Sequence, residues 1–288
     1  MFHIITNPIA GKKKLSVKNL EIVKNVFAQN GLDFTVHETA KKGDGQEICS
    51  HLTWEGETDL VVVGGDGTLH EVLNGMKDPT ECRLGLVPSG TGNDFAYSAG
   101  ISLNAEEAAK LVVRGETKET DYIELDGKRC MNVCGLGMDV DVLERCNRGK
   151  MRGKLKYLKS LLASLFAFKG YNIKIEADGY EKEHSALIAA ACNGKAFGGG
   201  IRICPTAEID DKKLSVVLVD CIGGKLKIIK AFLQLMKGKI LSYPAATHFL
   251  ANKVSFIPEK PVTIQLDGEL YTNVKFEAKI KGGLRMFR

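Results

Sequence analysis

The sequence LVVVGGDGTLHEVLNG, residues 60–75, decides the fold of this chain. Its four apolar residues, 60–63, predict a buried strand, and residues 69–75 predict a short helix after a glycine-rich turn. Glycines let backbone N–H groups approach a phosphate closely, and a helix that begins there directs its positive dipole end at the same phosphate. The carboxylate of Asp66 would suit a bound Mg²⁺ ion. This first glycine turn, residues 64–68, therefore predicts a nucleotide phosphate site and phosphoryl transfer.

Two common phosphate-binding motifs do not fit these residues. A Walker A loop needs a lysine after its last glycine, and none follows here. A dinucleotide fingerprint needs a third glycine where His70 stands. An ordinary tight turn between a strand and a helix is the alternative, although three glycines around a carboxylate exceed what such a turn needs.

A second glycine-rich turn follows one βα unit later. Residues 83–87 predict a strand, and the sequence PSGTGNDFA follows at residues 88–96. The carboxyl ends of parallel strands meet at one edge of a sheet, where ligands bind. We therefore expect this second glycine turn, residues 88–94, to face the same nucleotide as the first, with Asn93 and Asp94 adding polar and anionic groups.

Composition limits the class of protein. The chain has 288 residues, of which 44% are hydrophobic and 26% charged, as in a soluble globular protein. A net charge of +5 is too weak to indicate nucleic acid as a partner, but it is compatible with an anionic membrane surface, a phosphorylated substrate or simple solubility. The eight cysteines contain no C-x-x-C pair, so we expect core thiols in a reducing cytosol. We find no signal peptide and no apolar run long enough to span a membrane.

The hydrophobic pattern changes near residue 120. Before it, strand and helix signals alternate, with a helix over 17–27, a helix over 46–54 and a capping box of Asn104 with Glu107. After it, strand signals dominate, and Asp-Gly at 126–127, 178–179 and 267–268 predicts hairpin turns. Two further helices, over 153–168 and 225–237, are expected to face the core. The predicted fold class is α/β plus β: a doubly wound, mostly parallel sheet followed by an antiparallel β-sandwich.

The order of several motifs resembles the diacylglycerol kinase catalytic family, which includes bacterial soluble lipid kinases and the sphingosine and ceramide kinases. The matching residues are Asn7-Pro8 with Gly11, the stretches 64–75 and 88–96, Asn132 with Gly135, Asn193 with 198–200, Pro205 with Asp211 and Leu214, and Asp267-Gly268-Glu269. The resemblance implies a fold of the NAD-kinase and diacylglycerol-kinase type, in which ATP and lipid meet between two domains. The ATP-binding α/β domain would be residues 1–121, with 280–288 returning to it, and the β-rich lipid-substrate domain residues 122–279.

The resemblance also implies the site. The ATP contacts would fall on Asn7, Thr39, Gly64, Gly65, Asp66, Gly67, Thr68, Glu71 and Thr91. Asp66 would organise the catalytic Mg²⁺, supported by an acidic network of Asp94 and Asp121, because phosphoryl transfer depends on charge neutralisation and positioning. Glu269 would be the general base that takes the proton of the acceptor hydroxyl.

Two positions depart from the family pattern. A structural Mg²⁺ in the second domain would be held by Asp211 and by backbone carbonyls of Glu208 and Lys213, but the usual Asp-Gly-x-Leu is here Asp211-Lys212-Lys213-Leu214. A plain turn at the start of a strand is the alternative at that place. His70 stands where the family commonly has asparagine, and we expect a helix-surface residue in preference to a phosphate donor.

These observations predict an ATP-dependent lipid kinase that uses Mg²⁺ and converts a lipid alcohol, by default diacylglycerol to phosphatidic acid. We expect it in the cytoplasm, peripheral at the inner membrane face, where basic residues 145–159 could contact anionic lipid. A homodimer is compatible with the sequence. Two alternatives stay open: a kinase for NAD or another small molecule, and a non-catalytic lipid or nucleotide sensor on the same fold.

Overall fold

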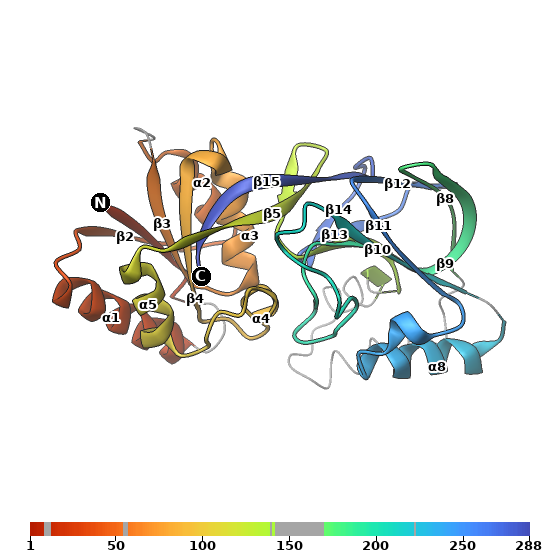
Figure 1. Ribbon diagram of the computed structural model, residues 1–288, viewed down its shortest axis with the longest axis horizontal. Helices are drawn as coiled ribbons and strands as arrows, with labels where there is room; N and C mark the ends of the chain where they lie inside the picture. Colours follow the sequence, from red (N-terminus) through yellow and green to blue (C-terminus); the bar gives the residue numbers. More distant parts are fainter. Residues whose placement is uncertain (9–12, 54–56, 139, 142–169, 222) are drawn as a thin grey trace.

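The computed structural model describes the chain except residues 9–12, 54–56, 139, 142–169 and 222, and it consists of two parts joined by long strands (Figure 1). In the first part, four parallel strands lie in the order β4-β3-β1-β2. They are β1 (Phe2–Thr6), β2 (Phe34–Glu38), β3 (Thr58–Gly64) and β4 (Cys82–Pro88). Every residue of β3 is buried, as the apolar run at 60–63 predicts.

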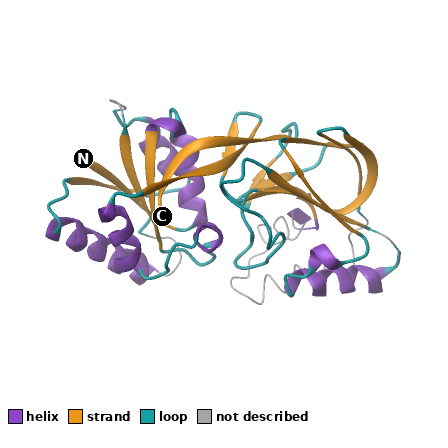
Figure 2. Ribbon diagram, in the orientation of Figure 1, coloured by secondary structure: helices purple, strands orange, loops and turns teal. Residues whose placement is uncertain are grey.

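Helices cover both faces of this parallel sheet (Figure 2). They are α1 (Lys13–Gln29), α2 (Asp44–Ser50), α3 (Asp66–Gly75), α4 (Asp94–Ala99) and α5 (Ala105–Arg114). Helices α1 and α5 contact each other, and α2 contacts α3, so the doubly wound arrangement is confirmed. The side chain of Asn104 caps α5 by accepting from the N–H groups of Glu106 and Glu107 at 2.9 and 3.3 Å. The carboxylate of Glu107 accepts from Ser102 instead of closing the predicted capping box.

Two long strands run from one part into the other (Figure 1). They are β5 (Thr117–Leu125) and β15 (Glu277–Phe287), which pair antiparallel from Ala278–Leu125 to Phe287–Thr117. The end of β15 also pairs parallel with β4 through residues 285 and 286, beside the first-part sheet. The expected domain boundary after residue 121 therefore falls inside β5, because one continuous strand serves both parts.

The second part is a β-sandwich with a helix packed outside it. Its further strands are β6 (Lys128–Cys130), β7 (Val133–Gly137), β8 (Tyr171–Ala177), β9 (Tyr180–Cys192), β10 (Leu214–Asp220), β11 (Ala246–Ala251), β12 (Lys253–Pro258), β13 (Ile264–Leu266) and β14 (Glu269–Tyr271). Alternate residues of β9 and β10 face opposite sides, as the period of a strand requires. Ala189 and Val216 face the interior of the sandwich, and Ala190 and Val217 face helix α8 (Lys225–Met236).

Several local predictions are confirmed. All three Asp-Gly pairs connect two strands and have positive φ at both residues, as a type I′ turn requires. The helix predicted over 225–237 forms, whereas the one predicted over 153–168 lies outside the described residues. No disulfide joins the described cysteines. None of the helices that the structure describes is long and apolar enough to cross a membrane.

Candidate active site

The two glycine turns lie against each other at the carboxyl ends of β3 and β4. The N–H of Ser89 donates to the carbonyl of Gly64 at 2.8 Å. A Cβ atom on Gly65 would lie 2.8 Å from Cα of Gly90, so only glycines allow this approach of two backbones. The expected proximity of the two turns is confirmed, since parallel pairing of the strands places Gly64 opposite Pro88.

A cavity of about 360 Å³ lies at these turns. Its lining residues are Asn7, Lys41, Lys42, Gly65, Asp66, Gly67, Thr68, Glu71, Gly90, Thr91 and Glu269. All but Lys41, Lys42 and Gly90 belong to the set that the family resemblance implied. The two lysines follow β2 without any hydrophobic period or motif, so the sequence carried no signal for them. Gly90 was visible as part of the second glycine turn.

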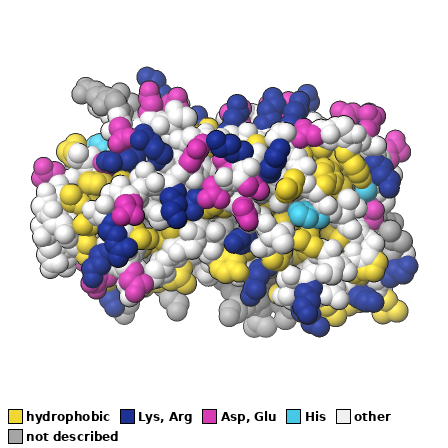
Figure 3. Space-filling model, in the orientation of Figure 1, with side chains coloured by type: hydrophobic (Ala, Val, Ile, Leu, Met, Phe, Trp, Pro, Cys, Tyr) yellow, Lys and Arg dark blue, Asp and Glu magenta, His cyan; other side chains and the backbone are white. Residues whose placement is uncertain are grey.

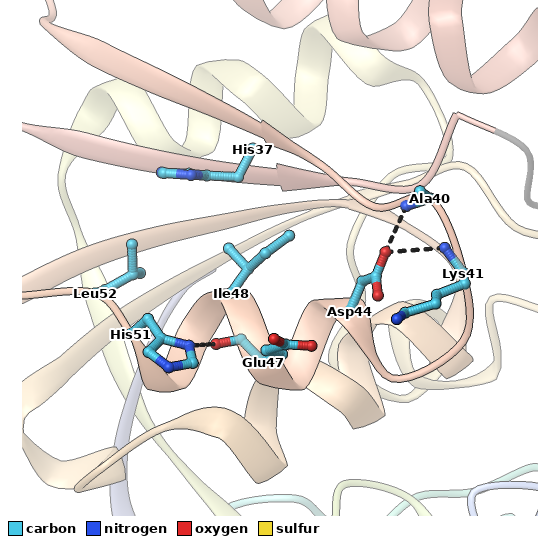
Figure 4. A pocket seen from close by; sticks show the side chains of 8 residues that line it. All are labelled: His37, Ala40, Lys41, Asp44, Glu47, Ile48, His51 and Leu52. Atoms are coloured by element: carbon cyan, nitrogen blue, oxygen red, sulfur yellow. Dashed lines mark hydrogen bonds between the residues drawn. The ribbon is translucent and has the colours of Figure 1, made fainter.

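A second cavity, of about 650 Å³, lies next to the first and shares Lys41 with it (Figure 4). The carboxylate of Asp44 accepts from the N–H groups of Ala40 and Lys41 at 2.7 and 2.9 Å. These backbone hydrogen bonds lower the pKa of Asp44. The carboxylate thereby fixes the turn after β2 that brings Lys41 and Lys42 to the smaller cavity.

Glu71 and Thr39 have structural contacts besides the nucleotide role predicted for them. The carboxylate of Glu71 accepts from the N–H groups of Gly43 and Gly45 at 2.8 and 3.0 Å, and so holds the start of α2 against α3. The backbone N–H of Thr39 donates to the carbonyl of Thr6 at 2.9 Å. Its hydroxyl is buried and has no hydrogen-bond partner among the described residues. Thr39 and Gly64 lie outside the cavity lining.

Asp66 and Asp94, one from each glycine turn, form an acidic pair. Burial raises the pKa of Asp66, and the charge of Asp94 adds to the effect, although the N–H of Phe95 donates to Asp66 at 3.1 Å. Burial also raises the pKa of Asp94, although it accepts from the N–H groups of Gly199 and Gly200 at 2.7 and 2.6 Å. The hydrogen bonds from Gly199 and Gly200 fasten a loop of the second part to the N-terminus of α4. The pair concentrates negative charge where a cation would be stabilised.

The structure does not bring Asp121 to this cavity. Its carboxylate accepts from the N–H of Lys212 at 2.7 Å, and its other oxygen is buried with no partner among the described residues. Burial raises the pKa of Asp121, and the carboxylates of Asp211 and Glu119 raise it further. The side chain expected in the acidic network therefore lies on β5, against the loop 208–213 that leads into β10.

The loop 208–213 carries the residues of the predicted structural metal site. Lys212 has φ of +58°, a left-handed conformation that favours glycine, which accounts for the glycine of the family pattern. Asp211 accepts from the N–H of Lys213 at 2.9 Å, and the ammonium of Lys213 donates to Asn252 at 2.9 Å. Glu208 is exposed. Within the described ranges, no three acidic, histidine or cysteine side chains gather as a metal ion would require.

Glu269 reaches the cavity from the second part. It begins β14, directly after the Asp267-Gly268 turn, and its carboxylate pairs with the ammonium group of Lys42 from the first part. The side chain of Glu269 is 30% exposed, so it faces both the cavity and solvent. The contact joins residues that are 227 positions apart and lies at the boundary between the two parts.

His70 is the clearest correction to the sequence-based expectations. It is not a helix-surface residue, because only 3% of it is exposed, and it is not among the residues that line the cavity. Its Nδ1 lies 3.1 Å from Oδ2 of Asp267, and its Nε2 lies 2.9 Å from the hydroxyl of Tyr271. The side chain therefore ties α3 to the hairpin that carries Glu269.

Asp267 is the buried partner that the hairpin prediction did not reveal. It accepts from the N–H groups of Met131 and Asn132 at 2.8 and 2.9 Å and from the thiol of Cys130 at 3.1 Å. Burial alone would raise the pKa of Asp267, but the hydrogen bonds from His70 and these groups outweigh it and hold the pKa below its ordinary value. A charged carboxylate is thus stable in the interior between the two parts.

The residues around the cavity fit a nucleotide. A Cβ atom on Gly67 would meet no protein atom within 4 Å, so the turn leaves open space beside the first N–H groups of α3. These groups and the lysines at 41 and 42 suit phosphate oxygens. Asp66 suits Mg²⁺, which keeps several waters and takes one or two carboxylates with its phosphate ligands.

Comparison with known proteins agrees with this geometry. A family model of the diacylglycerol kinase catalytic domain matches residues 1–125, and one of the YegS C-terminal NAD kinase β-sandwich-like domain matches residues 132–286. A relative from Xanthomonas oryzae pv. oryzae, named "Probable lipid kinase YegS-like", is 28% identical over 96% of this chain and 94% of its own. "Probable lipid kinase YegS" from Salmonella newport is 31% identical over 66% of each chain.

Solved structures show the same fold. A crystal structure of a diacylglycerol kinase from Bacillus anthracis strain Sterne is 22% identical, with a TM-score of 0.75 over 99% of this chain and 96% of that one. A further structure from the same strain is 25% identical, with a TM-score of 0.77 over the same shares of each chain. The chain belongs to the diacylglycerol kinase catalytic domain family, and its second part is the β-sandwich domain of the YegS type.

Proposed function

We propose that this protein is an ATP-dependent lipid kinase that transfers the γ-phosphate of ATP to the hydroxyl group of a lipid alcohol. Diacylglycerol, which would give phosphatidic acid, is the substrate we favour. One observation carries the proposal: the cavity at the glycine turns also contains the carboxylate of Glu269 from the other part of the chain. A phosphate site and a candidate proton acceptor therefore face each other, as transfer to a hydroxyl group requires.

The first part of the chain binds the nucleotide. The backbone N–H groups at the start of α3 and the side chains of Thr68 and Thr91 contact phosphate oxygens, while the Gly65–Gly90 approach keeps the turn open. When bound, ATP supplies the phosphoryl group and Mg²⁺ offsets its charge. Asp66 would hold the metal, and Asp94 fastens residues 199 and 200 to the N-terminus of α4 by accepting from their N–H groups.

The second part presents the acceptor. Glu269 takes the proton of the lipid hydroxyl as the oxygen attacks. Lys42 pairs with Glu269 and lines the same cavity, so its ammonium group can serve the carboxylate and a phosphate oxygen in turn. The Asp267-Gly268 turn, held by His70, sets where the Glu269 carboxylate lies.

Transfer of label from ATP to a total lipid extract tests the proposal, with the labelled product identified by mass. We expect a phosphorylated lipid alcohol, and phosphatidic acid from purified diacylglycerol. NAD and sugar phosphates belong in the same panel: label in these acceptors and none in lipid would favour a small-molecule kinase. Nucleotide binding without label in any acceptor would favour a sensor.

A further inference from the structure

The outer face of α8 carries apolar side chains that the fold does not use. Leu226, Leu233 and Met236 are 82%, 51% and 51% exposed, whereas Ile228 and Leu235 are buried against the sandwich. At about 100° per residue, the three exposed side chains fall on one side of the helix and the buried ones on the other. The helix therefore has two apolar faces, and one of them points away from the protein.

Lysines flank the outward apolar face, which we call the α8 stripe (Leu226, Leu233 and Met236). On a helical projection, Lys225 lies on one side of the stripe, and Lys230 and Lys237 lie on the other. The sequence contains no acidic residue between Asp220 and Glu259. In the space-filling view, hydrophobic and basic side chains mix along the lower edge of the second part, where α8 runs (Figure 3).

Contacts at the end of α8 lead toward the active site. A Cβ atom on Gly238, just past the helix, would lie 3.3 Å from Cβ of Arg202. The guanidinium of Arg202 lies 5.9 Å from the ring centroid of Tyr97, on α4, and Tyr97 is 53% exposed. Helix α4 begins at Asp94, behind the second glycine turn. Figure 1 shows α4 and α8 along the same lower edge of the molecule.

We propose that α8 docks this protein on an anionic lipid bilayer, with the α8 stripe in the boundary between headgroups and acyl chains. The inference rests on the proposed function, because a lipid acceptor must be taken from such a surface. Charge complementarity selects the partner: an apolar stripe between lysines, without acidic residues, is the pattern of helices that lie in a membrane interface. The long lysine stems let their ammonium groups reach the headgroups while the stripe inserts.

Co-sedimentation with vesicles of pure phosphatidylcholine, or of phosphatidylcholine with 30% phosphatidylglycerol, tests this docking. We expect the wild-type chain to sediment with the anionic vesicles. Charging the stripe (L226D/L233D) should weaken binding at least about 10-fold, since two leucines lose their burial. Removing three charges (K225Q/K230Q/K237Q) should weaken it on the order of 100-fold, at about 1 kcal/mol for each lysine.

Matched controls change the same chemistry elsewhere. Leu250→Asp alters a leucine that is 53% exposed on β11, and K253Q/K275Q/K279Q removes the three lysines around Glu277. Glu277 begins β15, the strand along the upper edge in Figure 1. Both controls should bind vesicles as the wild type does. Equal binding by the α8 variants and their controls would overturn the proposal. A dimer of the lipid-free wild type that becomes a monomer in L226D/L233D would assign the face to a second copy and would also overturn it.

A second assay separates this proposal from the proposed function. With diacylglycerol dispersed in detergent micelles, the α8 variants should keep wild-type turnover, because the stripe lies outside the active site. With the same lipid in anionic vesicles, the turnover of the α8 variants should fall in proportion to their loss of vesicle binding. If the wild type phosphorylated diacylglycerol neither in micelles nor in vesicles, the proposed function would be contradicted. The vesicle-binding assay would still test the docking of α8 on its own.

Discussion

Nδ1 of His70 lies 3.1 Å from Oδ2 of Asp267, and both side chains are only 4% exposed. The two residues are 197 positions apart and belong to different parts of the chain. His70 lies on the helix whose N-terminus forms the first glycine turn, and Asp267 opens the turn that presents Glu269. One buried contact therefore connects the phosphate site with the candidate base.

Replacing His70 tests this connection. His70→Ala should cost about 2 kcal/mol of unfolding free energy, because it leaves a buried carboxylate with one hydrogen bond fewer. We expect kcat to fall while KM for ATP stays unchanged, since the glycine turns keep their own contacts. Denaturant unfolding and steady-state kinetics measure both effects. His70→Asn retains one hydrogen-bond donor and should recover part of the unfolding free energy and part of kcat. Equal stability and equal kcat in the two variants would contradict a positioning role for His70.

The ionisation of Asp267 should appear in the pH dependence of stability. Its folded pKa lies below the ordinary value of 3.8, so its charged form stabilises the fold fully above that value. This contribution is lost as the pH falls from 3.8 through the lowered folded pKa. Asp267→Asn should cost about 2 to 3 kcal/mol near neutral pH and less at about pH 3. Urea unfolding of both chains measures the difference, and a difference independent of pH would contradict the assignment.

Replacing either of two glycines on α3 by alanine should have different effects on stability and ATP binding. A Cβ atom on Gly67 meets open space in the cavity, whereas one on Gly75 would lie 2.4 Å from the carbonyl oxygen of Gln46. Gly67→Ala should leave stability equal or about 0.5 to 1 kcal/mol higher, since alanine favours a helix, but it should weaken ATP binding. Gly75→Ala should cost about 2 kcal/mol through overpacking. Thermal unfolding measures the effect of each substitution on stability, and nucleotide titration measures its effect on ATP affinity. Unchanged ATP affinity in Gly67→Ala would contradict nucleotide binding at this turn.

Lys42 should matter for catalysis and little for stability. The pair with Glu269 is exposed at its lysine end, and exposed ion pairs contribute about 0 to 1 kcal/mol. We expect Lys42→Ala to lower kcat about 10-fold, with Lys42→Arg retaining most of it, because the charge serves the base and the phosphate. Lys110→Ala, which removes an exposed pair with Glu106, is the matched control. A Lys42→Ala chain with wild-type kcat would exclude Lys42 from the reaction.

Features set by neighbouring residues could be predicted from the sequence. The strand at 60–63, the turns at residues 64–68 and 88–94 and the three Asp-Gly hairpins each depend on a few consecutive residues, and each forms as expected. The family resemblance supplied most of the cavity lining for the same reason, because its motifs are local.

Features set by tertiary contact could not be predicted from the sequence. His70 has the same neighbours in sequence whether it faces solvent or a carboxylate 197 positions away. Lys42 belongs to a polar segment without periodicity, so its contact with Glu269 follows only from the packing of the two parts. Asp121 differs in another way: the family resemblance implied a place in the acidic network, and the structure shows its carboxylate accepting from the N–H of Lys212.

The central claim is that Glu269 accepts the proton of a lipid hydroxyl opposite a nucleotide held by the glycine turns. The most direct measurement compares single-turnover phosphorylation of diacylglycerol by the wild type and by Glu269→Gln, with ATP binding measured by calorimetry on the same preparations. We predict a rate about 100-fold or more lower in Glu269→Gln with ATP affinity unchanged, as for loss of a general base. An undiminished rate in that variant would contradict the account.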